Sequence, residues 1–125
     1  MAKILLAEGE TDLRWTLRYA LLKNKFEVAE AKSGEDVAPE LRRSKADLVV
    51  LDALMPRKNG LEVLDELKKD PATKAVPVLL LTLSGEKKLI EQAFARGARD
   101  VLPKSGFSVM KLLYSVRKAL ENGGS

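Results

Sequence analysis

The sequence lacks two residue types that carry much of protein chemistry: it has no cysteine and no histidine. Without cysteine, neither a disulfide framework nor a thiolate site can form. Without histidine, the usual general base and the most common zinc ligand are missing. Any chemistry must therefore come from Asp, Glu, Lys, Ser and Thr side chains.

Long hydrophobic runs are also absent, because every apolar run is far shorter than the roughly 20 residues of a membrane span. The opening Met-Ala-Lys-Ile-Leu-Leu-Ala lacks the apolar region and cleavage site of a signal peptide. We therefore expect a cytoplasmic protein with no membrane partner. The 22 basic and 18 acidic residues are interspersed and give a net charge of +4, so we expect no direct nucleic-acid partner.

The length of 125 residues fits one domain with a substantial core and leaves no room for a second. We expect that domain to span residues 1–121. The last residues, 122–125, read Asn-Gly-Gly-Ser, a composition typical of a flexible tail or a linker stub.

The central stretch of the chain is residues 47–60, where an apolar run ends on a carboxylate. Leu48 to Leu51 form a continuous, β-branched-rich run, which is typical of a strand covered on both faces of a parallel sheet. Asp52 follows directly, and ligands of open α/β sheets bind at the carboxyl ends of strands. Taken alone, Asp52 could equally well cap a turn, because Asp is common there.

Four other apolar runs lie before and after this strand in the sequence. Stretches in which apolar residues recur at helical spacing separate the runs from one another. The predicted strands are residues 3–7, 26–31, 48–51, 76–81 and 100–103. Strands alternating with helices predict an α/β fold, a five-stranded doubly wound parallel sheet with five helices on its two faces. Pro39 lies past the first turn of the second predicted helix, so we expect it to kink or shorten that helix.

Polar side chains follow several of these strands, and parallel strands would bring them to one edge. They are Glu8, Glu10, Asp52, Thr82 and Lys104. Adjacent acids can hold Mg²⁺, while an ammonium and a hydroxyl can stabilise phosphoryl oxygens. Asp52 would then accept a phosphoryl group by nucleophilic attack. Singly, each has an ordinary explanation as a solvated lysine, a helix cap or a loop acid; their joint order along the chain is harder to dismiss.

Four motifs carry a resemblance to a known family. They are Lys-Ile-Leu-Leu-Ala-Glu-Gly-Glu, Leu-Asp-Ala-Leu-Met-Pro-Arg-Lys-Asn-Gly, Leu-Thr-Leu-Ser-Gly-Glu and Gly-Ala-Arg-Asp-Val-Leu-Pro-Lys. In this order and spacing the chain resembles, over residues 3–121, a receiver domain of the bacterial two-component response regulators. The resemblance implies a flavodoxin-like sheet with strand order 2-1-3-4-5.

The same resemblance implies roles for particular residues. Asp52 would receive phosphate from a histidine kinase or phosphotransfer protein, and Thr82 and Lys104 would contact the phosphoryl group. Glu8, Asp52 and the main-chain carbonyl of Leu54 would hold Mg²⁺. The domain would be a signalling phosphoacceptor, not an enzyme; it would promote its own phosphoryl transfer and could promote autodephosphorylation. It would signal to a downstream effector protein or domain through its fourth helix, fifth strand and fifth helix.

The sequence departs from the family pattern at four places. Gly9 stands where the family has a second acid, so we expect weaker Mg²⁺ binding. Leu83 replaces Ala or Gly, and its bulk could restrict access to the site. Val101 replaces a Tyr or Phe that reorients on activation, a swing that a short, stiff side chain cannot make. Ser105-Gly106 follows Lys104 where the family has proline, and glycine would leave that loop more mobile.

These departures leave two functions open. One is a phosphoacceptor that uses Asp52, and the other is a degenerate receiver that binds partners independently of phosphorylation. A flavodoxin-like cofactor enzyme is poorly supported, because no Gly-x-Gly-x-x-Gly or Walker loop follows the first strand.

Overall fold

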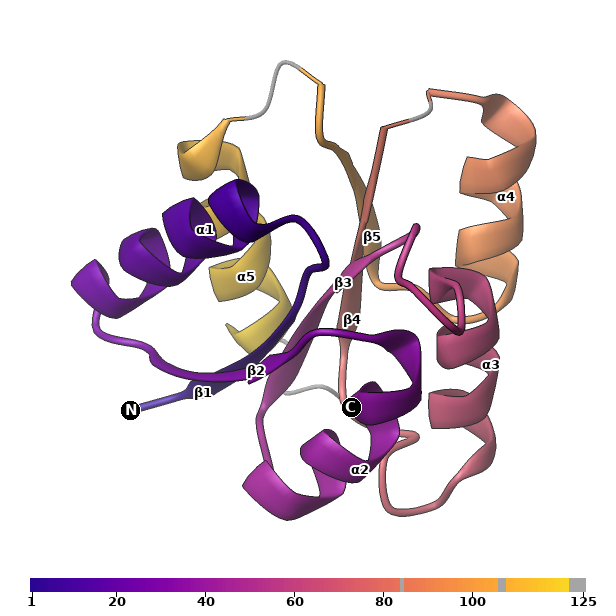
Figure 1. The fold of residues 1–125 in the computed structure, drawn as a ribbon, viewed down its shortest axis with the longest axis horizontal. Coiled ribbons are helices and arrows are strands. Elements are labelled where there is room, and N and C mark those ends of the chain that lie inside the picture. The colour runs from indigo at the N-terminus through magenta and orange to yellow at the C-terminus, as the bar shows by residue number, and fades with distance from the viewer. Residues whose placement is uncertain (84, 106–107, 122–125) are drawn as a thin grey trace.

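Strands and helices alternate along the whole chain in the computed structural model, which describes residues 1–83, 85–105 and 108–121. Figure 1 shows the arrangement. In chain order the elements are β1 (Lys3–Ala7), α1 (Thr11–Lys23), β2 (Glu27–Ala31), α2 (Gly34–Ser44), β3 (Leu48–Asp52), α3 (Gly60–Lys69), β4 (Val78–Thr82), α4 (Lys87–Ala95), β5 (Asp100–Pro103) and α5 (Val109–Glu121).

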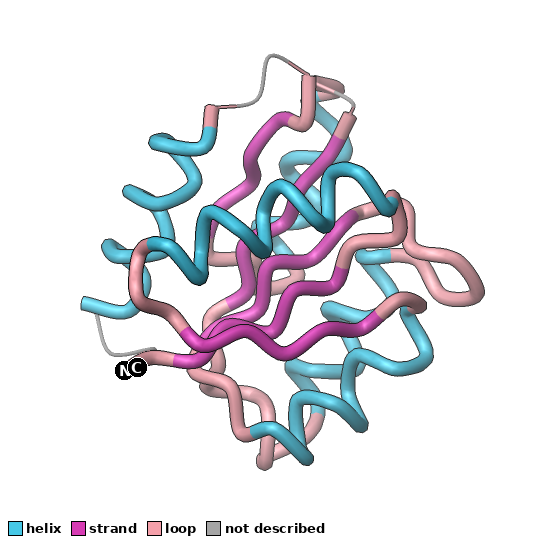
Figure 2. Tube along the Cα trace, turned by 60° about the vertical axis from the view of Figure 1, so that its left-hand side comes forward, coloured by secondary structure: helices cyan, strands magenta, loops and turns pink. Residues whose placement is uncertain are grey.

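The strands form one parallel sheet in the order β2-β1-β3-β4-β5, the twisted layer at the centre of Figure 2. Every residue of β3 and β4 is buried. This explains why these two strands read as continuous apolar runs: both of their faces are covered by helices. The predicted doubly wound sheet and its strand order are confirmed.

Two hydrophobic clusters lie on opposite faces of the sheet. One cluster joins α2, α3 and α4 to the strand residues Leu5, Val49 and Leu80. The other joins α1 and α5 to Leu6, Val50 and Leu79, the neighbours of those residues along the same strands. Successive strand residues therefore pack against opposite helix layers, as the pleat requires, and the two layers are visible on either side of the sheet (Figure 1).

Two local expectations can be compared with the structure. Pro39 lies inside α2 and does not shorten it, because the helix continues to Ser44. β4 begins at Val78 and not at residue 76; Pro77, which has no N–H to donate to a ladder, precedes it. Trp15 and Tyr19 are exposed on α1, and their rings stack on each other.

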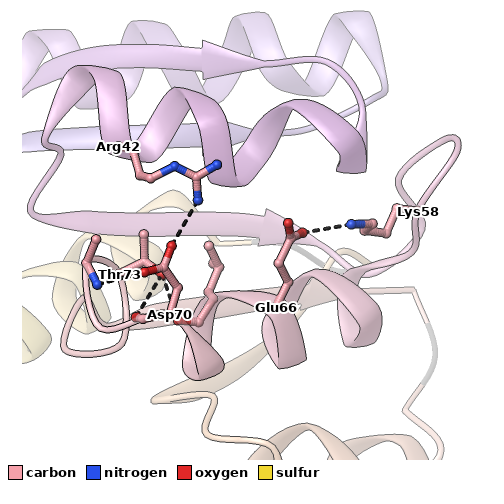
Figure 3. Close-up of polar contacts among 7 residues, drawn as sticks. Arg42, Lys58, Glu66, Asp70 and Thr73 are labelled. Atoms are coloured by element: carbon pink, nitrogen blue, oxygen red, sulfur yellow. Dashed lines mark hydrogen bonds and ion pairs between the residues drawn. The ribbon is translucent and has the colours of Figure 1, made fainter.

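Side-chain contacts hold helix α3 along its second half and just beyond it (Figure 3). Near its C-terminal end, Arg42 of α2 pairs with Asp70 at 3.0 Å. The buried Thr73 Oγ1 donates to the Leu67 carbonyl at 2.7 Å. Lys58, on the loop that follows β3, pairs with Glu66 of α3 at 2.8 Å. This last pair ties the loop after Asp52 to the helix.

None of the helices among residues 1–83, 85–105 and 108–121 has the length and apolarity needed to cross a membrane. The predicted tail, residues 122–125, lies outside the described residues, as does Gly106.

Candidate functional site

Asp52 is the last residue of β3 and lies at the carboxyl edge of the sheet. Its side chain is almost fully buried. One carboxylate oxygen, Oδ1, accepts a hydrogen bond from the Leu54 backbone N–H at 3.0 Å. The chain after it is held by the Ala53 N–H, which donates to the Leu81 carbonyl of β4 at 2.8 Å. The acid is thus fixed by the backbone that follows it.

Glu8 follows β1 and is completely buried. Its Oε2 accepts from the Glu10 N–H at 3.0 Å and from Lys104 Nζ at 3.0 Å. Within the described part of the chain, its other oxygen, Oε1, is buried without a hydrogen-bond partner. Arg14 of α1 donates to the Glu8 carbonyl at 2.9 Å and so fixes the backbone of this loop.

Lys104 follows β5 and joins the two acids. Its Nζ lies 3.0 Å from Glu8 Oε2 and 3.3 Å from Asp52 Oδ2, with only 8% of the side chain exposed. Its backbone N–H donates to the Thr82 carbonyl at 2.8 Å. The structure therefore brings Glu8, Asp52 and Lys104 together, although Lys104 is separated from Glu8 by most of the chain.

Thr82 and Glu10 are placed differently. Thr82 ends β4, is almost fully buried, and follows Leu81, the register partner of Asp52. It therefore lies on the strand next to Asp52, at the same edge. Glu10 is exposed and precedes α1. No group of three or more acidic side chains that could hold a metal ion occurs in the described ranges, so Glu10 does not complete a three-acid cluster.

The electrostatics of this cluster follow from burial and from its single cation. Burial raises the pKa of Glu8, and the charge of Asp52 acts in the same direction against the hydrogen bonds from Glu10 and Lys104. Burial would lower the pKa of Lys104, but the hydrogen bond to Glu8 and the charge of Asp52 outweigh it, and the pKa is raised. The lysine therefore stays an ammonium beside both carboxyl groups.

The residues present fit Mg²⁺ with a reduced donor set. Carboxylate and carbonyl oxygens are its preferred protein ligands, and Glu8 and Asp52 supply two carboxylates while the main-chain carbonyl of Leu54 could add a third oxygen. The orphaned Glu8 Oε1 is an acceptor that a cation would satisfy. Gly9 contributes no side-chain oxygen, and a Cβ there would lie 3.2 Å from Pro56 Cδ.

Sequence reasoning missed the residues that fix the loop after Asp52. A Cβ at Gly34 would lie 1.8 Å from the Lys58 carbonyl oxygen, so only glycine fits there. Asn59 and Glu62 form a capping box at the start of α3. Their spacing in the sequence is the signal that could have revealed this cap, whereas nothing local marks Gly34 as a contact point.

Besides Gly9, two further departures can be placed in the structure. Val101 is half-buried and packs against the cluster under α2, α3 and α4. Leu83 is 60% exposed, directly after Thr82.

Comparison with known proteins agrees with this geometry. The model of the response regulator receiver domain matches residues 4–117. The phosphate regulon transcriptional regulatory protein PhoB of Rhizobium meliloti is 32% identical over 120 residues, which are 96% of this chain and 52% of that protein. Protein PilH of Pseudomonas aeruginosa is 33% identical over 104 residues, 83% of this chain and 86% of PilH.

The solved structures show the same fold. A response regulator receiver domain protein from Clostridium thermocellum superposes with a TM-score of 0.89 at 26% identity, covering 98% of this chain and 97% of that one. The chain belongs to the response regulator receiver domain family of two-component signalling. It spans only about half the length of PhoB.

Proposed function

We propose that this domain accepts a phosphoryl group on Asp52 from the phosphohistidine of a histidine kinase or phosphotransfer protein. The supporting observation is the Lys104 ammonium, 3.3 Å from Asp52 Oδ2 and almost fully buried. A buried cation beside a buried carboxylate is suited to an acceptor that must receive an anionic group. Thr82, at the end of the neighbouring strand, offers a hydroxyl at the same edge.

The chemistry is a transfer between two nucleophiles. A carboxylate oxygen of Asp52 attacks phosphorus, the bond from phosphorus to the donor imidazole breaks, and the imidazole takes a proton from solvent. The product is an acyl phosphate on Asp52, and water attack later releases inorganic phosphate. An ammonium has three donors, so Lys104 can retain Glu8 while it binds a phosphoryl oxygen.

Mg²⁺, held by Glu8, Asp52 and the main-chain carbonyl of Leu54, would neutralise charge on the phosphoryl oxygens. The protein residues orient the carboxylate and the ammonium and supply a further hydrogen-bond donor. The Leu54 N–H orients the Asp52 carboxylate, Glu8 orients Lys104, and Thr82 supplies a hydroxyl donor.

We also propose bounds for the domain, its location in the cell and the surface through which it signals. Residues 1–121 form the receiver, with 122–125 as a tail or linker stub. The domain is cytoplasmic and promotes its own phosphorylation and dephosphorylation. It passes the signal through α4, β5 and α5 to an effector protein or domain. PhoB is named as a transcriptional regulatory protein; we propose that any nucleic-acid contact belongs to such an effector and not to this domain.

Intact-mass measurement after incubation with acetyl phosphate and Mg²⁺ tests the acceptor directly. We expect one phosphoryl adduct on the unmodified chain and none on Asp52→Asn, which keeps the shape but not the nucleophile. Beryllofluoride binding, followed by NMR, should show the same dependence on Asp52. If Asp52→Asn is labelled as fully as the parent chain, the acceptor assignment is wrong.

A phosphorylation-independent interaction module is the second candidate. It is favoured by Gly9, which removes an acid from the site, and by the ion pairs that already occupy Lys104. In that case, binding of a partner protein would be equally tight for the parent chain and Asp52→Ala, with and without acetyl phosphate. A large effect of acetyl phosphate on that binding would exclude this alternative.

A further inference from the structure

An apolar cavity of about 220 Å³ opens beside the proposed phosphorylation site. It lies between the loop after β3, the end of β4 and the start of α4, the elements that approach one another at the carboxyl edge in Figure 1. Its walls include Leu54, Leu61, Leu83 and Leu89, with Ala53 and Thr82.

Two of these leucines are unusually exposed. Leu54 is 69% exposed and Leu83 is 60% exposed. Exposed apolar side chains that gather around a concavity often mark a binding site.

The lining restricts the chemistry of a ligand. Among the described residues, no charged side chain lines the cavity, and the polar lining residues are Thr82 and Asn59. The Asn59 side chain is already engaged, because its Oδ1 accepts from the Glu62 N–H at 3.0 Å. An enclosed apolar cavity of about 150 Å³ is large enough to bind benzene, and this cavity is larger but open to solvent at Leu54 and Leu83. We propose that this cavity binds a neutral single-ring aromatic molecule.

Such a ligand would touch two groups of the proposed site. The Leu54 N–H holds Asp52 Oδ1 at 3.0 Å, and Thr82 forms part of the cavity wall. An occupied cavity therefore restrains the backbone at Leu54 and the approach to Thr82. This step rests on the proposed function, and it predicts that the ligand slows beryllofluoride binding at Asp52.

Fluorobenzene is a suitable probe, titrated into the full chain without phosphodonor and followed by ¹⁹F NMR. We expect saturable binding of fluorobenzene to the parent chain. Leu83→Ala should weaken this binding at least about fivefold, because the isobutyl group that forms part of the cavity wall is lost. Leu54→Ala should act in the same direction. Leu22→Ala is the matched control, since Leu22 is an exposed leucine on α1, away from the cavity; its affinity should be unchanged.

Each outcome of these measurements leads to a different conclusion. Equal affinity in the parent chain and Leu83→Ala, or an equal loss in Leu22→Ala, would overturn the proposal. Self-association that Leu83→Ala abolishes and fluorobenzene leaves intact, measured by sedimentation, would instead assign the cavity to a second copy of this chain. Failure of beryllofluoride to bind any variant would overturn the proposed function and leave the fluorobenzene result readable by itself.

Discussion

Asp52 is enclosed by two walls that are built in different ways. The β3–α3 wall, residues 53–60, is held mainly by the backbone: the Gly34 N–H donates to the Pro56 carbonyl at 3.0 Å, and the Gly60 N–H donates to the Ala53 carbonyl at 2.8 Å. The Lys58–Glu66 ion pair adds one charged contact, which is partly exposed. The charged wall consists of Glu8, Gly9 and Lys104. It is held mainly by ion pairs between long side chains.

The two walls therefore have different roles: one fixes the position of Asp52, and the other responds to pH and ions. Steric contact and neutral hydrogen bonds depend little on pH or ions, so the β3–α3 wall keeps Asp52 in place. Charged contacts depend on both, so the charged wall is where protons, cations and the phosphoryl group of the proposed transfer would act. Substitutions in the first wall should change stability, and substitutions in the second should change ion binding and pH dependence.

The largest expected effect is that of Gly34→Ala. Its new Cβ would lie 1.8 Å from the Lys58 carbonyl oxygen, a backbone atom that cannot simply rotate away. We expect the free energy of unfolding to fall by more than about 3 kcal/mol, measured by urea denaturation. Gly85→Ala is the control, because nothing lies within 4 Å of a Cβ there; it should change stability by less than about 0.5 kcal/mol. Similar values for the two variants would contradict the steric account of this wall.

A smaller effect is expected in the charged wall from Gly9→Asp. The added carboxylate should tighten Mg²⁺ binding on the order of tenfold, because it supplies a further oxygen ligand and a negative charge. Isothermal calorimetry with MgCl₂ measures this directly. Gly9→Asn adds similar bulk near Pro56 without the charge, and therefore controls for the 3.2 Å contact with Pro56 Cδ. Unchanged Mg²⁺ affinity in the Asp variant would show that Gly9 does not limit the metal site.

The smallest expected effect is a pH dependence set by Glu8. Because burial raises its pKa in the folded state, Glu8 binds its proton more tightly when folded. Its contribution to stability is therefore fully present below its unfolded pKa and is lost as the pH rises through its folded pKa. Urea denaturation between acid and neutral pH should show the parent chain losing stability relative to Glu8→Gln as the pH rises. A stability difference that is flat or opposite in sign would contradict the raised pKa.

Much of the site could be predicted because it lies at strand ends. Asp52, Thr82 and Lys104 end or follow β3, β4 and β5, and parallel pairing carries all three to one edge. The ion pairs of Lys104 with both Glu8 and Asp52 could not be predicted, since they depend on how far a flexible side chain reaches across β4.

The sequence by itself determined the alternation of strands and helices, the buried centre of the sheet and the polar residues at its carboxyl edge, because hydrophobic periodicity and strand ends are local properties. Only the tertiary structure decided the contact that admits no side chain at Gly34, the orphaned oxygen of Glu8 and the leucine-lined cavity beside Thr82. Each of these depends on the distance between segments far apart in the chain, and such distances are fixed only when the helices pack on the sheet.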